Sequence, residues 1–120
     1  MIELFDVSDN VLGFKMDGSI SPQEFDEIVK KVDKKVIDAE GRKLRVYAEI
    51  VELGMIPPEK FIDNIKFKFK HFKDFEKEAV VSDKKWLNTF ISVTEKFFPS
   101  IEAKTFSFEE KDEALKWVQS

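Results

Sequence analysis

Hydrophobic and polar residues alternate in two short runs near the start of the chain, at residues 2–4 and 12–16. A period of two is typical of a β-strand with one buried face. Residues 8–10, Ser-Asp-Asn, lie between the runs and favour a tight turn. The pattern therefore predicts an N-terminal β-hairpin that ends at Asp17-Gly18.

After the hairpin, the spacing of apolar residues becomes that of a helix. Ser21, Pro22 and Glu24 suit an N-cap, a first helical position and a capping box. We expect the helix to run to about Glu40 and to end at Gly41. The residues expected on its buried face are Phe25, Ile28, Val29, Val32 and Val36.

Residues 58–75 fit two different patterns. With a period of two, Ile65, Phe67 and Phe69 alternate with lysines, as in a half-buried strand. With a period of 3.6, Ile65 and Phe69 share one side of a helix with Phe61 and Phe72. The segment is longer than an ordinary strand, so the helical interpretation is favoured. It predicts that those four side chains are buried, whereas Phe67 lies on the charged face.

Three further strands are predicted from β-branched, aromatic and apolar runs at residues 43–53, 77–83 and 101–108. The run at 77–83 is almost continuously apolar at its centre, which is typical of a parallel strand buried on both faces. A third helix is predicted at residues 84–98, and Pro99 is expected to end it.

A second capping-box pattern, Ser107 with Glu110, opens a closing helix. The apolar residues of that helix are Ala114, Leu115, Trp117 and Val118. The elements then alternate as hairpin, α, β, α, β, α, β, α. This order predicts an α/β fold with a mostly parallel sheet, an N-terminal β-hairpin and about four helices, in two or three layers.

Length and composition restrict the function classes. The 120 residues suit a single domain, 1–120, and no apolar run could span a bilayer. The acidic start does not resemble a secretory signal, and the lack of cysteine fits a cytoplasmic protein. The net charge of −4 argues against nucleic acid as the main partner.

The residues that could carry catalysis do not form a recognisable set. His71 is the sole histidine. Near the C-terminus of a helix, it is better explained by its interaction with the helix dipole than as a metal ligand. Ser82-Asp83 has no accompanying base and is better explained as a helix cap. Asp74, Glu76 and Glu78 are interspersed with lysines, which indicates a solvated mixed-charge turn. No enzyme activity, metal or cofactor is expected.

The thirteen phenylalanines are the most informative feature of the composition. One interpretation is a well-filled core. The other is an apolar pocket between the second and third helices and the sheet, open to a small molecule or lipid. The candidate pocket residues are Met55, Ile56, Phe61, Ile65, Phe69, Trp86, Phe90 and Phe97.

The second predicted helix also has a basic face. Phe67 has three basic neighbours. Lys66 precedes it in the sequence, and Lys70 and His71 lie one helical turn after it. Such a face is usually only solvated, but an exposed aromatic residue among basic ones also suits contact with a membrane surface or a protein partner.

A family likeness is carried by the pattern K-H-x-x-x-F-x-x-x-A-V-V-(S/T)-D-x-x-W. Its residues here are Lys70, His71, Phe75, Ala79, Val80, Val81, Ser82, Asp83 and Trp86. With the stretches Asp17 to Glu24 and Ala114 to Val118, the chain resembles the SpoIIAA-like branch of the STAS superfamily. The resemblance implies a small α/β sandwich, related in shape to the lipid-carrying CRAL-TRIO domains.

The resemblance also implies bacterial, cytoplasmic, non-enzymatic work. The leading hypothesis is a module that binds an apolar small molecule or lipid, or associates with a membrane surface. The alternative is a phospho-independent regulator that recognises a protein, as anti-sigma-factor antagonists do. The loop at residues 53–61 holds no serine or threonine, so no phosphorylation switch is carried over. A homodimer is left open.

Overall fold

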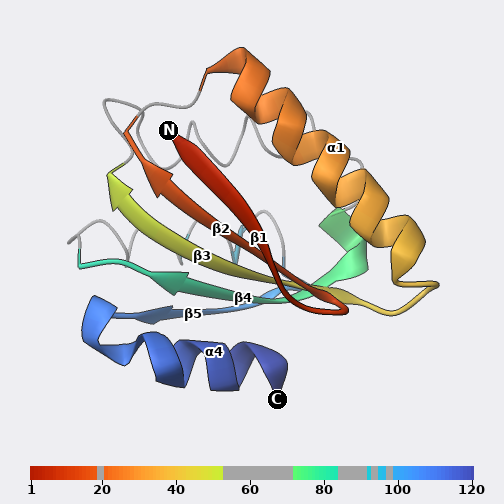
Figure 1. Ribbon diagram of the computed structural model, residues 1–120. Helices are drawn as coiled ribbons and strands as arrows, with labels where there is room; N and C mark the ends of the chain where they lie inside the picture. Colours follow the sequence, from red (N-terminus) through yellow and green to blue (C-terminus); the bar gives the residue numbers. More distant parts are fainter. Residues whose placement is uncertain (19–20, 53–71, 84–91, 93–94, 97–98) are drawn as a thin grey trace.

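The computed structural model describes residues 1–18, 21–52, 72–83, 92, 95–96 and 99–120 (Figure 1). Its centre is a five-stranded sheet in the order β1-β2-β3-β4-β5. The strands are β1 (Ile2–Ser8), β2 (Val11–Asp17), β3 (Leu44–Glu52), β4 (Phe75–Val81) and β5 (Glu102–Phe106). β1 is antiparallel to β2, which confirms the hairpin, and each later strand is parallel to its neighbour.

Two α-helices lie in the described part of the chain, one on each side of the sheet (Figure 1). They are α1 (Pro22–Asp38) and α4 (Lys111–Gln119), and short 3-10 turns precede β4 (Phe72–Asp74) and α4 (Phe108–Glu110). The sheet and the two helices form three layers. The remaining helices of the sequence prediction fall mainly outside the described residues, so the expected number of helices is met only in part.

The capping box predicted for α1 is present. The Ser21 hydroxyl accepts a hydrogen bond from Glu24 N, and the Glu24 carboxylate accepts one from Ser21 N, both at 3.1 Å. The second oxygen of Glu24 accepts a hydrogen bond from Ile2 N at 2.9 Å. The same carboxylate therefore caps the helix and holds the first residues of β1. The helix ends where Glu40 and Gly41 adopt φ values of 51° and 89°.

The apolar face of α1 covers the hairpin. Leu12 of β2 forms a buried cluster with Ile28 and Val32 of the helix. The partly buried side chains packed against this cluster are Ile2, Leu4, Phe25, Val29, Val36 and Phe75. The residues predicted to form the buried face of α1 thus pack as expected, although three of them stay half-buried.

The other face of the sheet packs against α4. Its buried cluster consists of Val11, Tyr47, Ala79, Val81, Phe106, Ala114 and Val118. Phe5 of β1 lies directly opposite Gly13 of β2, and its ring meets that of Tyr47 edge-on with 6.2 Å between centroids. The glycine leaves the space in which the Phe5 ring lies, because a methyl group at this position would overlap the ring.

Both ends of α4 are tied to the sheet by polar contacts. At its start, the Asp83 carboxylate after β4 accepts a hydrogen bond from Phe108 N at 3.2 Å. At its end, Arg45 donates to the carbonyl oxygen of Val118 at 2.9 Å, and Lys77 donates to that of Trp117 at 3.2 Å. These cationic side chains donate hydrogen bonds to carbonyl groups that have no intrahelical partner at a helix C-terminus.

One sequence prediction is wrong at its C-terminal end. The helix predicted for residues 58–75 cannot extend to Phe75, because Phe72–Asp74 is a 3-10 turn and Phe75 is the first residue of β4. Phe75 pairs with Leu44 in the parallel ladder and packs against the α1 cluster. These contacts override the helical spacing that includes Phe72. The earlier part of the predicted helix lies outside the described residues.

Candidate functional site

All the functional residues predicted from the sequence lie outside the described part of the chain. The candidate pocket residues are Met55, Ile56, Phe61, Ile65, Phe69, Trp86, Phe90 and Phe97, and the candidate surface residues are Lys66, Phe67, Lys70 and His71. The structure does not test these assignments. It describes the central sheet and a polar pocket that the sequence does not suggest.

The middle of the face of β3, β4 and β5 that points away from α4 has short side chains, between the larger Leu44 and Ile50 of β3. Val46 and Ala48 of β3 pair with Glu78 and Val80 of β4. These in turn pair with the short side chains of β5, Ala103 and Thr105. Paired residues on neighbouring strands share a face, and alternate residues such as Tyr47 point toward α4 instead. This surface is called the short-side-chain face below.

Glu78 brings a carboxyl group to the short-side-chain face. Two predictions from the sequence disagree about Glu78: a solvated mixed-charge turn with Asp74 and Glu76, and a strand at residues 77–83. The strand is confirmed, and the turn is wrong for Glu78. Glu78 lies in the middle of β4, and burial raises its pKa to about 7. Glu76 also lies in β4, where it forms an ion pair with Arg45 at 3.4 Å. The apolar run at residues 79–81, directly after Glu78, was the sequence signal for the strand.

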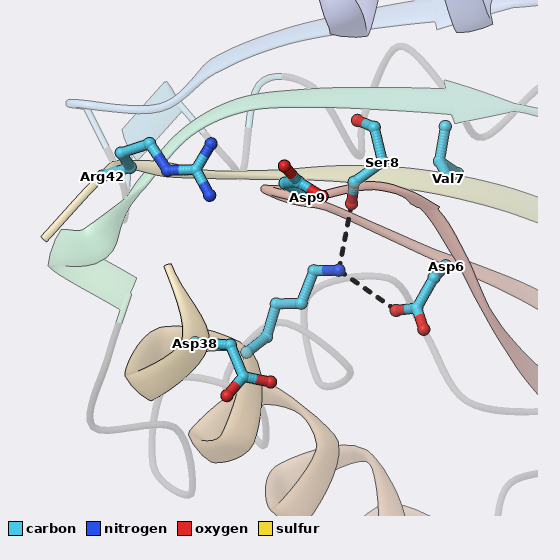
Figure 2. A pocket seen from close by; sticks show the side chains of 7 residues that line it. Asp6, Val7, Ser8, Asp9, Asp38 and Arg42 are labelled. Carbon is cyan, nitrogen blue, oxygen red and sulfur yellow. Dashed lines mark hydrogen bonds and ion pairs between the residues drawn. The ribbon is translucent and has the colours of Figure 1, made fainter. Parts of the chain in front are cut away.

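A polar pocket of about 510 Å³ lies at the opposite end of the parallel strands from their carboxyl ends, between the β1–β2 turn and the last turn of α1 (Figure 2). Its lining residues are Asp6, Val7, Ser8, Asp9, Lys35, Asp38 and Arg42. The turn is fixed to the α1–β3 connection, because Asn10 donates a side-chain hydrogen bond to the carbonyl oxygen of Lys43 at 3.1 Å.

Lys35 forms the buried wall of this pocket. Only 10% of its side chain is exposed. Its ammonium group donates to the Asp6 carboxylate at 3.1 Å and to the carbonyl oxygen of Ser8 at 3.0 Å, as the dashed lines in Figure 2 show. The hydrogen bond from Lys35, with a weaker effect from Lys31, holds the pKa of Asp6 below its usual value.

The outer wall of the pocket carries three more charged groups. Arg42 donates from Nε to the carbonyl oxygen of Ala39 at 3.2 Å, which fixes its guanidinium plane at the end of α1. Figure 2 shows this group extending into the pocket, with Asp9 on the hairpin turn and Asp38 on the helix. Both carboxylates lack an ion-pair partner among the described residues.

An ion pair links α4 to β3. The Glu49 carboxylate forms an ion pair with Lys111 at 3.0 Å, and its side chain is 13% exposed. Burial, together with the nearby Glu49 carboxylate, raises the pKa of the Tyr47 hydroxyl. Tyr47 is therefore protonated and acts as a packing residue beneath α4.

The described residues contain no group of three or more histidine or carboxylate side chains arranged to hold a metal ion. Among them, no helix is long and apolar enough to cross a bilayer.

Comparison with known proteins gives the family. The model of the family described as SpoIIAA-like matches residues 11–119. The chain belongs to the SpoIIAA-like family. The match includes all the sheet except β1, both described helices and the segments that hold the predicted site residues. The expected resemblance is thus confirmed. Curated proteins give no match to this SpoIIAA-like chain.

Two solved chains match the SpoIIAA-like chain. One is described as the crystal structure of an uncharacterized protein from the DUF3478 family with a SpoIIAA-like fold, from Shewanella loihica PV-4. The two sequences are 23% identical, and the match covers 98% of this chain and 92% of that one, with a TM-score of 0.73. At this identity the likeness shows the fold alone.

The polar pocket was missed by the sequence analysis, although one signal was present. Lys35 follows Val32 at the i+3 position and Ile28 at i+7, so it falls on the apolar stripe of α1. A lysine at such a position must find acceptors from a neighbouring element. The carbonyl oxygen of Ser8 and the carboxylate of Asp6 are those acceptors.

Proposed function

We propose that this SpoIIAA-like chain is a non-enzymatic STAS-type module that binds an apolar small molecule or lipid against the short-side-chain face. The observation that carries the proposal is the face itself. Val46, Ala48, Val80 and Ala103 occupy little volume on three adjacent strands. Larger side chains on the opposite face, such as Tyr47, fill the space below α4.

Connections between parallel strands give a reason to assign the predicted pocket residues to this face. Such connections are right-handed, so crossovers that advance in one direction across a sheet lie on one side. α1, the connection from β2 to β3, lies on the side of Leu12. The proposal extends this rule to the β3–β4 and β4–β5 connections, which contain Phe61, Phe69 and Trp86.

Glu78 gives the proposed site one carboxyl group, on a face that also carries the hydroxyl group of Thr105. A carboxyl group with a pKa of about 7 is protonated in a large fraction of molecules near neutral pH. A protonated carboxyl donates a hydrogen bond, whereas an ionised one only accepts. The ligand class that suits an apolar layer with one such donor is a fatty acid or a lipid ester, whose oxygens accept hydrogen bonds.

The first experiment is native mass spectrometry of the purified protein, followed by displacement of a fluorescent fatty acid. We expect a co-purified apolar ligand or saturable binding of the probe. Flotation with phospholipid vesicles would show whether the same protein associates with a membrane surface. Protein without ligand that neither binds the fatty acid nor floats would contradict the proposal.

A pair of substitutions separates a ligand site from a packed core. Ala103→Leu adds volume at the short-side-chain face, and Ala79→Leu adds the same volume beneath α4, where Ala79 is fully buried. If the face is a ligand site, Ala103→Leu should reduce fatty-acid binding with little loss of stability. Ala79→Leu should cost about 1–3 kcal/mol of stability, as overpacking of a core does. Equal destabilisation by both would assign the face to the core.

A protein partner is the second candidate function. The observation that favours it is the sheet order, in which β1 and β5 are the outer strands among the described residues. Outer strands present unpaired backbone groups to which another chain can add a strand. A defined dimer without ligand in the mass spectrum would favour this phospho-independent regulatory role.

A further inference from the structure

Lys35 and Asp6 form an ion pair in the polar pocket between the β1–β2 turn and α1, and the pocket also contains charges of both signs that form no ion pair with one another. Arg42 uses Nε for the carbonyl oxygen of Ala39, so the two terminal nitrogens of its guanidinium group remain without a partner among the described residues. The carboxylates of Asp9 and Asp38 line the same pocket and likewise have none.

The buried wall supplies an independent observation. The Lys35 ammonium has three N–H groups, and the described residues accept two of them, through Asp6 and Ser8. The side chain is nine-tenths buried, and its ammonium group lines the pocket beside Asp6, whose side chain is 59% exposed. A buried donor without an acceptor is unfavourable. The remaining N–H of Lys35 is therefore a hydrogen-bond position that a molecule in the pocket could fill.

The pocket presents two chemically different halves. Lys35 and Arg42 offer N–H donors and positive charge, which suit a carboxylate or phosphate. Asp9 and Asp38 offer negative charge, and the C-terminus of α1 adds the negative end of its helix dipole. This second half suits an ammonium group. A volume of about 510 Å³ is within the range of small-molecule sites.

We propose that this pocket binds a small zwitterion of amino-acid size. Its acidic group lies between Lys35 and Arg42, and its ammonium group lies against Asp9 and Asp38. The pocket is formed by α1, the hairpin turn and the α1–β3 connection, and it shares no residue with the short-side-chain face. The inference therefore goes beyond the apolar-ligand proposal and does not depend on it.

The test is a titration of the ¹⁵N-labelled full chain, monitored by NMR. The probes are glycine, L-alanine, L-glutamate and phosphoethanolamine, with acetate and ethylammonium as ligands that carry only one of the two charges. We expect saturable amide shifts at Ser8, Asp9 and Arg42 with at least one zwitterion. Acetate and ethylammonium should bind about tenfold more weakly or not at all, since each satisfies only half of the pocket.

Variants show which half of the pocket contributes. Arg42→Gln and Asp38→Asn should each weaken binding of the zwitterion about tenfold. The matched control is Glu27→Gln, which also removes one negative charge from an exposed position of α1. Glu27 is about 16 Å from Asp38 along the helix axis. This control should leave binding unchanged. Dispersed spectra and unchanged melting temperatures would confirm that each variant is folded.

Three results would overturn the proposal. The first is that every shift grows linearly with concentration and never saturates. The second is that acetate binds as well as the zwitterions and that Asp38→Asn has no effect, which would indicate a simple anion site. The third is that Glu27→Gln weakens binding as much as the pocket variants do, which would indicate a general charge effect.

Discussion

Glu78 differs from Glu24 and Glu110 in the direction of its pKa shift. Glu24 and Glu110 accept hydrogen bonds from the backbone N–H groups of Ser21 and Ser107, which hold the pKa of each below its ordinary value. Glu78 lies instead on an apolar face, where burial favours the neutral form. The first two carboxylates stabilise the fold when ionised, whereas Glu78 stabilises it most when protonated.

The shift at Glu78 predicts a stability that decreases with pH. In the unfolded chain its pKa is near the ordinary value of 4.5, and in the folded chain it is about 7. Its contribution is complete below pH 4.5 and is lost as the pH rises through 7, because the folded state then has to accommodate a charge on a half-buried side chain of the sheet. The loss between these limits is about 3 kcal/mol. Urea unfolding of the wild type and Glu78→Gln from pH 5 to 8 measures it.

In that experiment, Glu78→Gln should resemble the wild type at pH 5 and exceed its stability at pH 8. Glu76→Gln is the matched control on the same strand. It removes the ion pair with Arg45 at all these pH values and should shift the whole profile without changing its slope. Parallel profiles for the wild type and Glu78→Gln would contradict the assigned pKa.

Gly13 is a second residue whose role follows from its immediate contacts. A methyl group at this position would lie closer than 3.0 Å to three ring carbons of Phe5. Gly13→Ala should therefore cost about 1–3 kcal/mol of stability, since the ring must move from its contact with Tyr47. Combining it with Phe5→Leu should recover part of that loss in a double-mutant cycle.

Gly41 provides the control for this cycle. Its φ is 89°, and a methyl group at this position would meet no atom within 4 Å, so Gly41→Ala is expected to cause backbone strain without a side-chain clash. Its cost should not change when Phe5→Leu is added. Additive losses for Gly13→Ala and Phe5→Leu would contradict the proposed ring contact.

Residue identity alone could predict some of these roles but not others. The capping pattern of Ser21 and Glu24 depends on local spacing, so it could be predicted and is confirmed. The contact between Gly13 and Phe5 depends on the register of two strands, and the polar pocket depends on where α1 meets the hairpin turn. Lys35 indicates that a partner is needed, but the sequence does not say that Ser8 and Asp6 supply it.

At the scale of elements, α1 and β1 are joined through one carboxylate. Glu24 accepts hydrogen bonds from Ser21 N and Ile2 N, and it lies 3.9 Å from the N-terminal ammonium group. Ser21→Ala removes only the hydroxyl cap and should cost about 1 kcal/mol. Glu24→Ala should cost more, because it removes the cap and the contact with β1 together.

Two measurements can check this coupling. Hydrogen exchange at Ile2 should accelerate in Glu24→Ala but change much less in Ser21→Ala. Gln23→Ala, at an exposed position in the same helical turn, should affect neither stability nor exchange. Since the pKa of Glu24 is lowered, its contribution should be present above pH 4.5 and lost as the pH falls through the lowered value. A Glu24→Ala effect no larger than that of Ser21→Ala would mean that β1 is held independently.

The type of an element could be predicted from the sequence where one pattern dominated. Its first and last residues could not. The hairpin, α1, β3, β5 and α4 lie close to their predicted ranges. β4 begins two residues before its predicted start, at Phe75, which the helical spacing assigned to the preceding helix. A residue whose spacing suits a helix can still begin a strand when a parallel neighbour provides its ladder partner, and Leu44 is that partner.

At the scale of the whole molecule, the sheet joins two layers of different character. On one side, α4 covers a cluster of larger side chains, including Tyr47 and Phe106, and both of its ends are tied to the sheet. On the other side, α1 covers the hairpin, next to the short-side-chain face that contains Glu78. Loss of a proton from Glu78 therefore affects the centre of the sheet, far from the polar pocket at its end.

This arrangement predicts the order in which backbone amides exchange. β3 has parallel partners on both sides, whereas β1 and β5 each have one. We expect the highest opening free energies in β3, because its amides should exchange only on global unfolding. Those of β1 and β5 should be lower, because an outer strand can open locally. NMR exchange measurements at pH 6 and 8, corrected for intrinsic rates, give these free energies.

The pH dependence distinguishes global from local opening. Ionisation of Glu78 lowers global stability, so the opening free energies of β3 should fall between pH 6 and 8, and those of β1 should change less. The Glu78→Gln variant should abolish the fall in β3. Equal opening free energies in β3 and β5 would show that the sheet opens as one unit. A fall in β3 that persists in Glu78→Gln would show that another group controls its stability.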